Sequence, residues 1–123
     1  MTTRRFIVPA VSDGAGAGTF YTPYLSGFVE SIQYVKTDYT DGVDFTITAE
    51  ATGETIWTQL DVNAAVIVHP RAATHSTAGV ASVYVAAGSA VLDYVALGRD
   101  RIKIVLASAG ATKTGSFTVT IRE

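Results

Sequence analysis

The fold is decided by seven residues near the middle of the chain, which read Asp44-Phe45-Thr46-Ile47-Thr48-Ala49-Glu50. Side chains of an extended strand point alternately to its two faces, so Phe45, Ile47 and Ala49 share one face and the two threonines share the other. Thr52-Gly53 follows as a turn, and residues 54–60 resume an extended pattern. This region therefore predicts a β-hairpin with one buried face and one wet face.

The same period-two pattern recurs outward from this hairpin, at residues 28–36, 101–107 and 115–122. Shorter extended runs are expected at residues 5–8, 19–21, 66–68, 82–86 and 91–97, with turns about every ten residues and hardly any helical spacing. The pattern predicts an all-β protein, a single antiparallel β-sandwich of about eight or nine short strands. We favour a jelly-roll-like order and keep an immunoglobulin-like order as the alternative, because spacing does not determine strand order.

The chain has 123 residues, which suits one domain over residues 1–123. Its N-terminal part is rich in small residues, with Gly14, Gly16 and Gly18 separated by alanines. Few large side chains are available there to pack against a core, so residues 1–18 are expected to form a flexible N-terminal arm.

Composition excludes several functions. Charged residues make up 16% of the chain and the formal net charge is −2, so no basic field is available to hold nucleic acid. There is no cysteine, which excludes disulfides and thiolate metal sites. No apolar run approaches the ~20 residues of a membrane helix, and the N-terminus does not read as a signal peptide. We expect a chain made in the cytosol, with no nucleic acid or membrane partner.

Residues suited to catalysis are few. His69 and His75 are the only histidines, and two imidazoles without nearby carboxylates are too few for a catalytic zinc. No nucleophile elbow is present. The sequence therefore predicts no enzyme, no catalytic residue, no cofactor and no metal site. Asp38, Asp41 and Asp44 form a turn whose spacing differs from an EF-hand loop, and a cation there is left open.

Partner contacts are instead expected near turns and loops, in residues 4–18 and residues 71–79. The candidate contact residues are Arg4, Arg5, Phe6, Tyr21, Tyr24, Tyr39, His69, Arg71 and His75. Trp57 lies in the middle of an expected strand, where packing on the core or on a sheet face is the usual role. An exposed Trp57 beside other aromatic rings would instead favour a carbohydrate-binding module.

Three segments carry a resemblance to known proteins: residues 34–58 (YVKTDYTDGVDFTITAEATGETIWT), residues 70–79 (PRAATHSTAG) and residues 100–105 (DRIKIV). Together they resemble a group of small proteins encoded in tailed-bacteriophage and prophage genomes, usually among the virion structural genes. The resemblance covers most of the chain from Tyr34 onward and brings no catalytic residues with it.

The resemblance implies a virion structural protein, specifically a capsid decoration (cement) protein. Such a protein would lie on the capsid surface, bind the outside of the major capsid protein shell and stabilise it. We expect it to self-associate as a dimer or trimer, because symmetric copies multiply weak contacts into firm attachment. A tail or head–tail junction protein and a carbohydrate-binding module are the alternatives.

Overall fold

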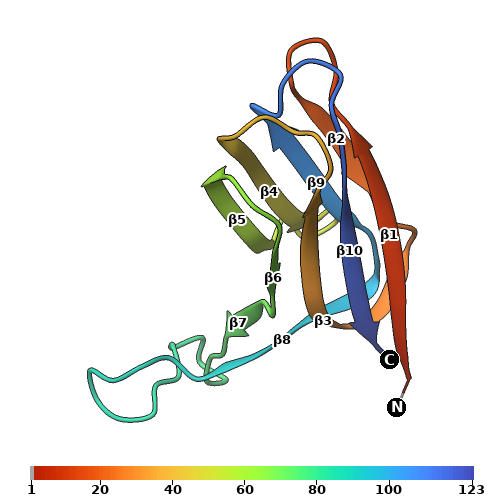
Figure 1. Ribbon diagram of the computed structural model, residues 1–123. Coiled ribbons are helices and arrows are strands. Elements are labelled where there is room, and N and C mark those ends of the chain that lie inside the picture. The colour runs from red at the N-terminus through yellow and green to blue at the C-terminus, as the bar shows by residue number, and fades with distance from the viewer. Residues whose placement is uncertain (1) are drawn as a thin grey trace.

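The computed structural model describes residues 2–123, and Met1 lies outside the described part. These residues form an all-β structure of ten antiparallel strands in two sheets packed face to face, which confirms the predicted β-sandwich class (Figure 1). The strands are β1 (Thr3–Val11), β2 (Gly18–Tyr21), β3 (Leu25–Lys36), β4 (Val43–Ala49), β5 (Thr55–Val62), β6 (Val66–Val68), β7 (Arg71–Ala73), β8 (Leu92–Asp100), β9 (Ile102–Ala107) and β10 (Thr114–Arg122).

The larger sheet has six strands in the order β1-β10-β3-β8-β7, and β6 pairs with β3 beyond the end of β8. The smaller sheet has the order β2-β9-β4-β5. The chain changes sheets several times, so strands distant in sequence become neighbours, as β1 and β10 do along nine residue pairs. This order is what the spacing of the sequence left open.

The alternation that predicted the strands also builds the core. In β4, β9 and β10 the buried positions alternate with positions that are partly or fully exposed. Phe45, Phe117 and Tyr34 come from three different strands, and their ring centroids lie 5.2 to 5.4 Å apart at the centre of the core. Aromatic contacts at this spacing stabilise a fold beyond the area they bury.

The N-terminal segment differs from the flexible arm that the sequence favoured. Thr3–Val11 is an edge strand fully paired with β10. The Gly/Ala loop after it is a closed turn, because the Asp13 carboxylate accepts the N–H groups of Ala17 and Ala15 at 3.0 and 2.8 Å. These bonds, that of Ala17 first, lower the pKa of Asp13. The order of this segment comes from strand β10 and from Lys113, which pair with residues about a hundred positions away in the sequence.

Residues 82–100 also differ from expectation. The strand expected at residues 82–86 is absent, because that segment lies outside both sheets and meets no core. Residues 98–100 read Gly-Arg-Asp, a sequence typical of turns, but they lie within β8, which runs on to Asp100. Asp100 is buried, and its carboxylate accepts the N–H groups of Ala51 and Arg101 at 3.0 and 2.8 Å.

Candidate functional site

Residues 74–91 leave the body of the sandwich as a projection. In Figure 1 it extends from the end of the body at which both termini lie, on the side away from β1. Two small hairpins form it, closed by the bridges His75–Ala81 and Val83–Ala90. The Ser82 N–H donates to the Thr74 carbonyl at 2.9 Å, and the Val91 N–H donates to the Ser82 carbonyl at 3.0 Å. These two bonds hold the hairpins together at their base.

The composition of the projection is unusual for an exposed segment. No Asp, Glu, Lys or Arg occurs between Arg71 and Asp93. Its large side chains are nevertheless in water: the exposed fraction is 71% for Tyr84, 68% for Val85, 65% for Val80 and 44% for Val83. Long exposed segments of soluble domains usually carry charge, and a cluster of exposed apolar side chains is typical of a surface that binds another protein.

A cluster of charged and aromatic side chains fixes the base of the projection. Arg71 and Tyr94 are paired across β7 and β8, and the Arg71 Cζ lies 4.1 Å from the Tyr94 ring centroid. Arg122 approaches the same ring at 5.0 Å and pairs with Glu30 at 3.2 Å. Arg71 Nη1 also donates to the carbonyls of Pro70 and Glu30, at 2.8 and 3.2 Å.

This cluster explains the position of Arg71, one of the expected contact residues. Its guanidinium is engaged by its own chain and holds the projection to β3 and β8. The two cation–π contacts with the Tyr94 ring are worth about 0.5 to 1 kcal/mol each at partly exposed sites. The Arg122–Glu30 ion pair contributes less, because its two facing atoms form no hydrogen bond. The base is thus firm, whereas most residues of the hairpins beyond it are exposed.

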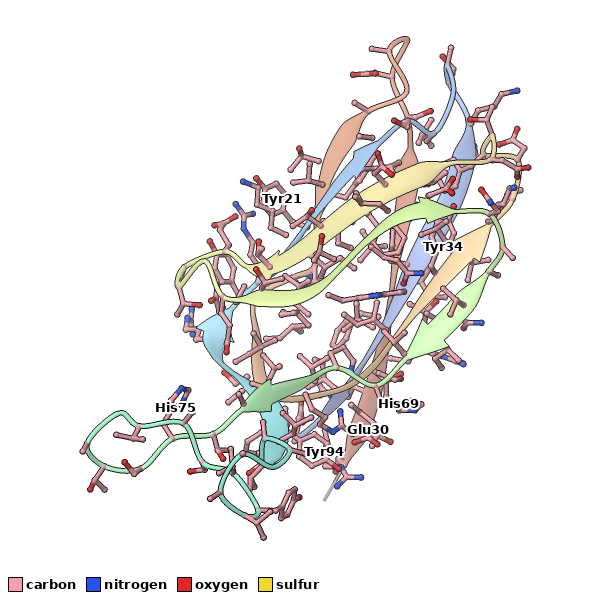
Figure 2. All side chains as sticks on the ribbon, turned by 90° about the vertical axis from the view of Figure 1, so that its left-hand side faces the viewer. Tyr21, Glu30, Tyr34, His69, His75 and Tyr94 are labelled. Atoms are coloured by element: carbon pink, nitrogen blue, oxygen red, sulfur yellow. The ribbon has the colours of Figure 1, made fainter. Side chains whose placement is uncertain are left out.

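The two histidines lie in different places. Figure 2 shows His75 on the projection and His69 beside the body, near Glu30 and Tyr94. Both side chains are exposed. Each lies in or beside the predicted contact region of residues 71–79, but they do not form one cluster.

Tyr21 and Tyr24 are both exposed and share a cation. The Arg101 Cζ lies 4.0 Å from the Tyr21 centroid and 5.3 Å from the Tyr24 centroid, and Arg101 Nε pairs with Glu50 at 2.7 Å. The hydrogen bond to Glu50 is the main cause that raises the pKa of Arg101. This second surface cluster lies on the outside of the body, remote from His75 (Figure 2).

Tyr39 is not a surface residue, which corrects its assignment as a contact. It is 3% exposed, its hydroxyl donates to the Ala10 carbonyl, and its ring stacks on that of Tyr34. Its place beside a turn suggested exposure, but the turn folds back over the core. Among the N-terminal candidates, Arg4 and Arg5 are exposed, and Phe6 is partly buried against the core.

The acidic turn does not gather its carboxylates around one point. Asp38 accepts the Thr114 N–H at 2.5 Å, Asp41 pairs with Lys36 at 2.7 Å, and Asp44 accepts the Asp61 N–H at 2.9 Å. The bond from Thr114 is the main cause that lowers the pKa of Asp38. Within residues 2–123 no three His, Cys, Asp or Glu side chains are placed to hold a metal ion.

Trp57 turns its ring inward, against the core. Its centroid lies 4.6 Å from that of Phe45 in an edge-on contact, and Nε1 donates to Gln59 Oε1 at 3.1 Å. The described residues enclose no pocket, and none of them forms a helix with the length and hydropathy to cross a membrane.

The exposed apolar side chains of the projection were missed by sequence reasoning. The sequence predicts strands at residues 82–86 and 91–97, and it predicts no contact residue in either of them. The available signal was the long interval without charge from Ala72 to Leu92. In the structure the flanking strands β7 and β8 stop at the two ends of this interval, at Ala73 and Leu92.

In comparisons with known proteins, no protein-family model matches this chain, and no curated protein matches it.

Proposed function

We propose that this chain is a non-enzymatic structural protein of a tailed-phage particle, a capsid decoration protein that binds the outside of the major capsid protein shell and stabilises it. The observation that carries the proposal is the projection, an exposed segment without charge that presents Val80, Tyr84 and Val85 to its surroundings. Removing these apolar side chains from water lowers the free energy, so a protein neighbour that covers them binds favourably.

Two further features support an assembly role. The body is rigid, with a core drawn from both sheets, and a rigid scaffold loses little conformational entropy when it docks. Only 16% of the residues are charged, so wide areas of surface can be covered at small desolvation penalty. The resemblance of residues 34–58 and 70–79 to virion proteins of tailed phages is the reason why we propose a phage particle as the assembly.

Co-sedimentation tests the proposal. Empty capsids of the phage that carries the gene are mixed with the purified protein and pelleted through a sucrose cushion. We expect the protein to pellet with capsids, to saturate at a fixed ratio to the major capsid protein, and to raise the temperature at which the capsids disrupt. Serum albumin is the control for trapping. Failure to pellet at saturating concentration contradicts the proposal.

A structural protein of the tail or the head–tail junction is the second candidate, since the same surface features serve any permanent assembly. It differs in copy number, because a junction needs a ring of about six or twelve copies whereas decoration scales with the area of the shell.

A further inference from the structure

We infer that the projection of one copy docks on the outer face of the six-stranded sheet of a second copy, in a head-to-tail contact. The occupant of that sheet face is thus the charge-free segment 74–91 of another molecule of this chain. The proposed assembly role gives this contact a purpose, but the contact itself depends only on two surfaces of this chain.

The receiving surface is a row of four residues across four neighbouring strands. Ile7 on β1 pairs with Thr118 on β10, Thr118 with Gln33 on β3, and Gln33 with Ile67 on β6. Directly paired residues of antiparallel strands point to the same face, and their neighbours Val119 and Ile32 are buried, so this row points outward. Ile7 is 64% exposed and Ile67 is 53% exposed.

The next row along the sheet continues the uncharged surface. Pro9 pairs with Ser116 and Ser116 with Val35. With strands about 4.8 Å apart, the Ile7–Ile67 row spans roughly 14 Å, which suits the width of a two-segment ribbon with its side chains. The outer face of the smaller sheet differs: its row is Thr19, Val105, Thr46 and Thr58, and hydroxyl groups dominate it.

Exposed charges of opposite sign border the two surfaces, whereas Arg71, which also lies at the base of the projection, is engaged by its own chain. Arg5 precedes Ile7 by two positions on the same face of β1, and Asp93 follows Leu92 at the base of the projection; both are exposed. Neither border charge has to be buried when the apolar parts meet. Their attraction would orient one copy on the next, as rim charges do at protein interfaces.

The pairing of unlike surfaces also accounts for more of the exposed apolar area than the pairing of like surfaces. Two projections pressed together would cover Tyr84 and Val85 but leave Ile7 and Ile67 of both copies in water. The projection leaves its own body on the side away from β1, so it does not reach the β1 end of its own Ile7–Ile67 row (Figure 1). A head-to-tail contact uses both surfaces of every copy, and if the rotation closes it forms a ring.

The absence of cysteine makes the contact directly testable, since each introduced thiol reports on one position. Val85→Cys on the projection, Ile67→Cys on the row and Val105→Cys on the smaller sheet are prepared with tags of different mass. After mild oxidation of equimolar mixtures, we expect the disulfide between Val85→Cys and Ile67→Cys to predominate over either disulfide of like chains. We expect the mixture of Val85→Cys with Val105→Cys to give little mixed product. Predominant Val85→Cys dimers, or a statistical mixture, overturn the inference.

Sedimentation equilibrium gives the second readout. The unmodified protein should associate reversibly, and Val85→Asp or Ile67→Asp should each weaken the association by about tenfold or more. Val105→Asp, the same type of change on an exposed site of the smaller sheet, should leave it unaltered. Circular dichroism and thermal unfolding confirm that each variant is folded. A monomer at the highest concentrations overturns the inference, and if that monomer still pellets with capsids the decoration role stands without it.

Discussion

The ring of Tyr34 lies parallel to the ring of Tyr39, with 6.0 Å between centroids and 4° between planes. Both side chains are buried, but their hydroxyls differ. That of Tyr39 donates to the Ala10 carbonyl, whereas that of Tyr34 has no hydrogen-bond partner among residues 2–123. The same chemical deletion therefore has opposite expected effects at two neighbouring positions.

Tyr39→Phe should lower the free energy of unfolding by about 1 to 2 kcal/mol, because the Ala10 carbonyl loses a buried donor. Tyr34→Phe should leave stability unchanged or raise it by up to about 1 kcal/mol, because it removes an unpaired buried hydroxyl. Urea titrations of the two variants beside the unmodified protein measure the difference. Equal destabilisation of both variants would contradict this description of the core.

Stability should fall at alkaline pH. Burial raises the pKa of Tyr34 to about 12 from 10.0, and burial, followed by the nearby Tyr34 and Asp38, raises the pKa of Tyr39. The folded chain then keeps phenolic protons that the unfolded chain releases near pH 10. Stability is complete below about pH 10 and declines as the pH rises toward 12, by about 1.4 kcal/mol per pH unit for each tyrosine.

Urea titrations between about pH 9 and 12 measure this slope. Tyr34→Phe removes one of the two titrating groups, so its slope should be smaller than that of the unmodified protein by about 1.4 kcal/mol per pH unit. An unchanged slope in that variant would show that the alkaline loss comes from other groups.

Gly115→Ala should be strongly destabilising although alanine is small. A Cβ at this position would lie 2.5 Å from Cζ of Tyr39 and still nearer to Cε2, and the stacked, hydrogen-bonded ring has no free direction to move. We expect a loss of about 2 to 3 kcal/mol. Gly14→Ala is the matched control, because a Cβ there meets nothing within 4 Å. Thermal unfolding compares the two, and a similar transition temperature for both would refute the predicted clash.

The Arg71–Tyr94 contact should determine how firmly the projection is held. Arg71→Ala removes the guanidinium and its bonds to the carbonyls of Pro70 and Glu30. We expect the amides of residues 74–91 to exchange with solvent several-fold faster, while those of β9 are unchanged, because the loss is local. Hydrogen exchange with mass spectrometry measures this. Arg4→Ala, at an exposed arginine on the other face of β1, is the control, and equal exchange in both variants would remove the role assigned to Arg71.

The fold class was predictable because alternation is a local signal with a local cause. Residues 44–50 and 115–122 alternate since each strand has one face on the core, and both form strands in the structure. Strand order was not predictable, because pairs such as Thr3 with Arg122 depend on residues at opposite ends of the chain. The closed turn at Asp13 has the same origin, since its partners include Thr112.

The contact residues were predictable only in part. The region of residues 71–79 does lead into the projection, but its expected anchor Arg71 is used within the chain, and Tyr39 is in the core. The sequence predicts a strand that includes Tyr84 and Val85, because an extended pattern alone does not reveal whether a core lies opposite. Only the tertiary structure distinguishes a buried alternating segment from an exposed one.

Quantitative mass spectrometry of purified phage particles, with the major capsid protein as the internal standard, tests the proposed role most directly. A decoration protein predicts that the chain is a constituent of the particle, in a copy number that scales with the number of capsid protein subunits. A ring of about six or twelve copies would assign it to the junction instead. Its absence from intact particles would contradict a virion role altogether.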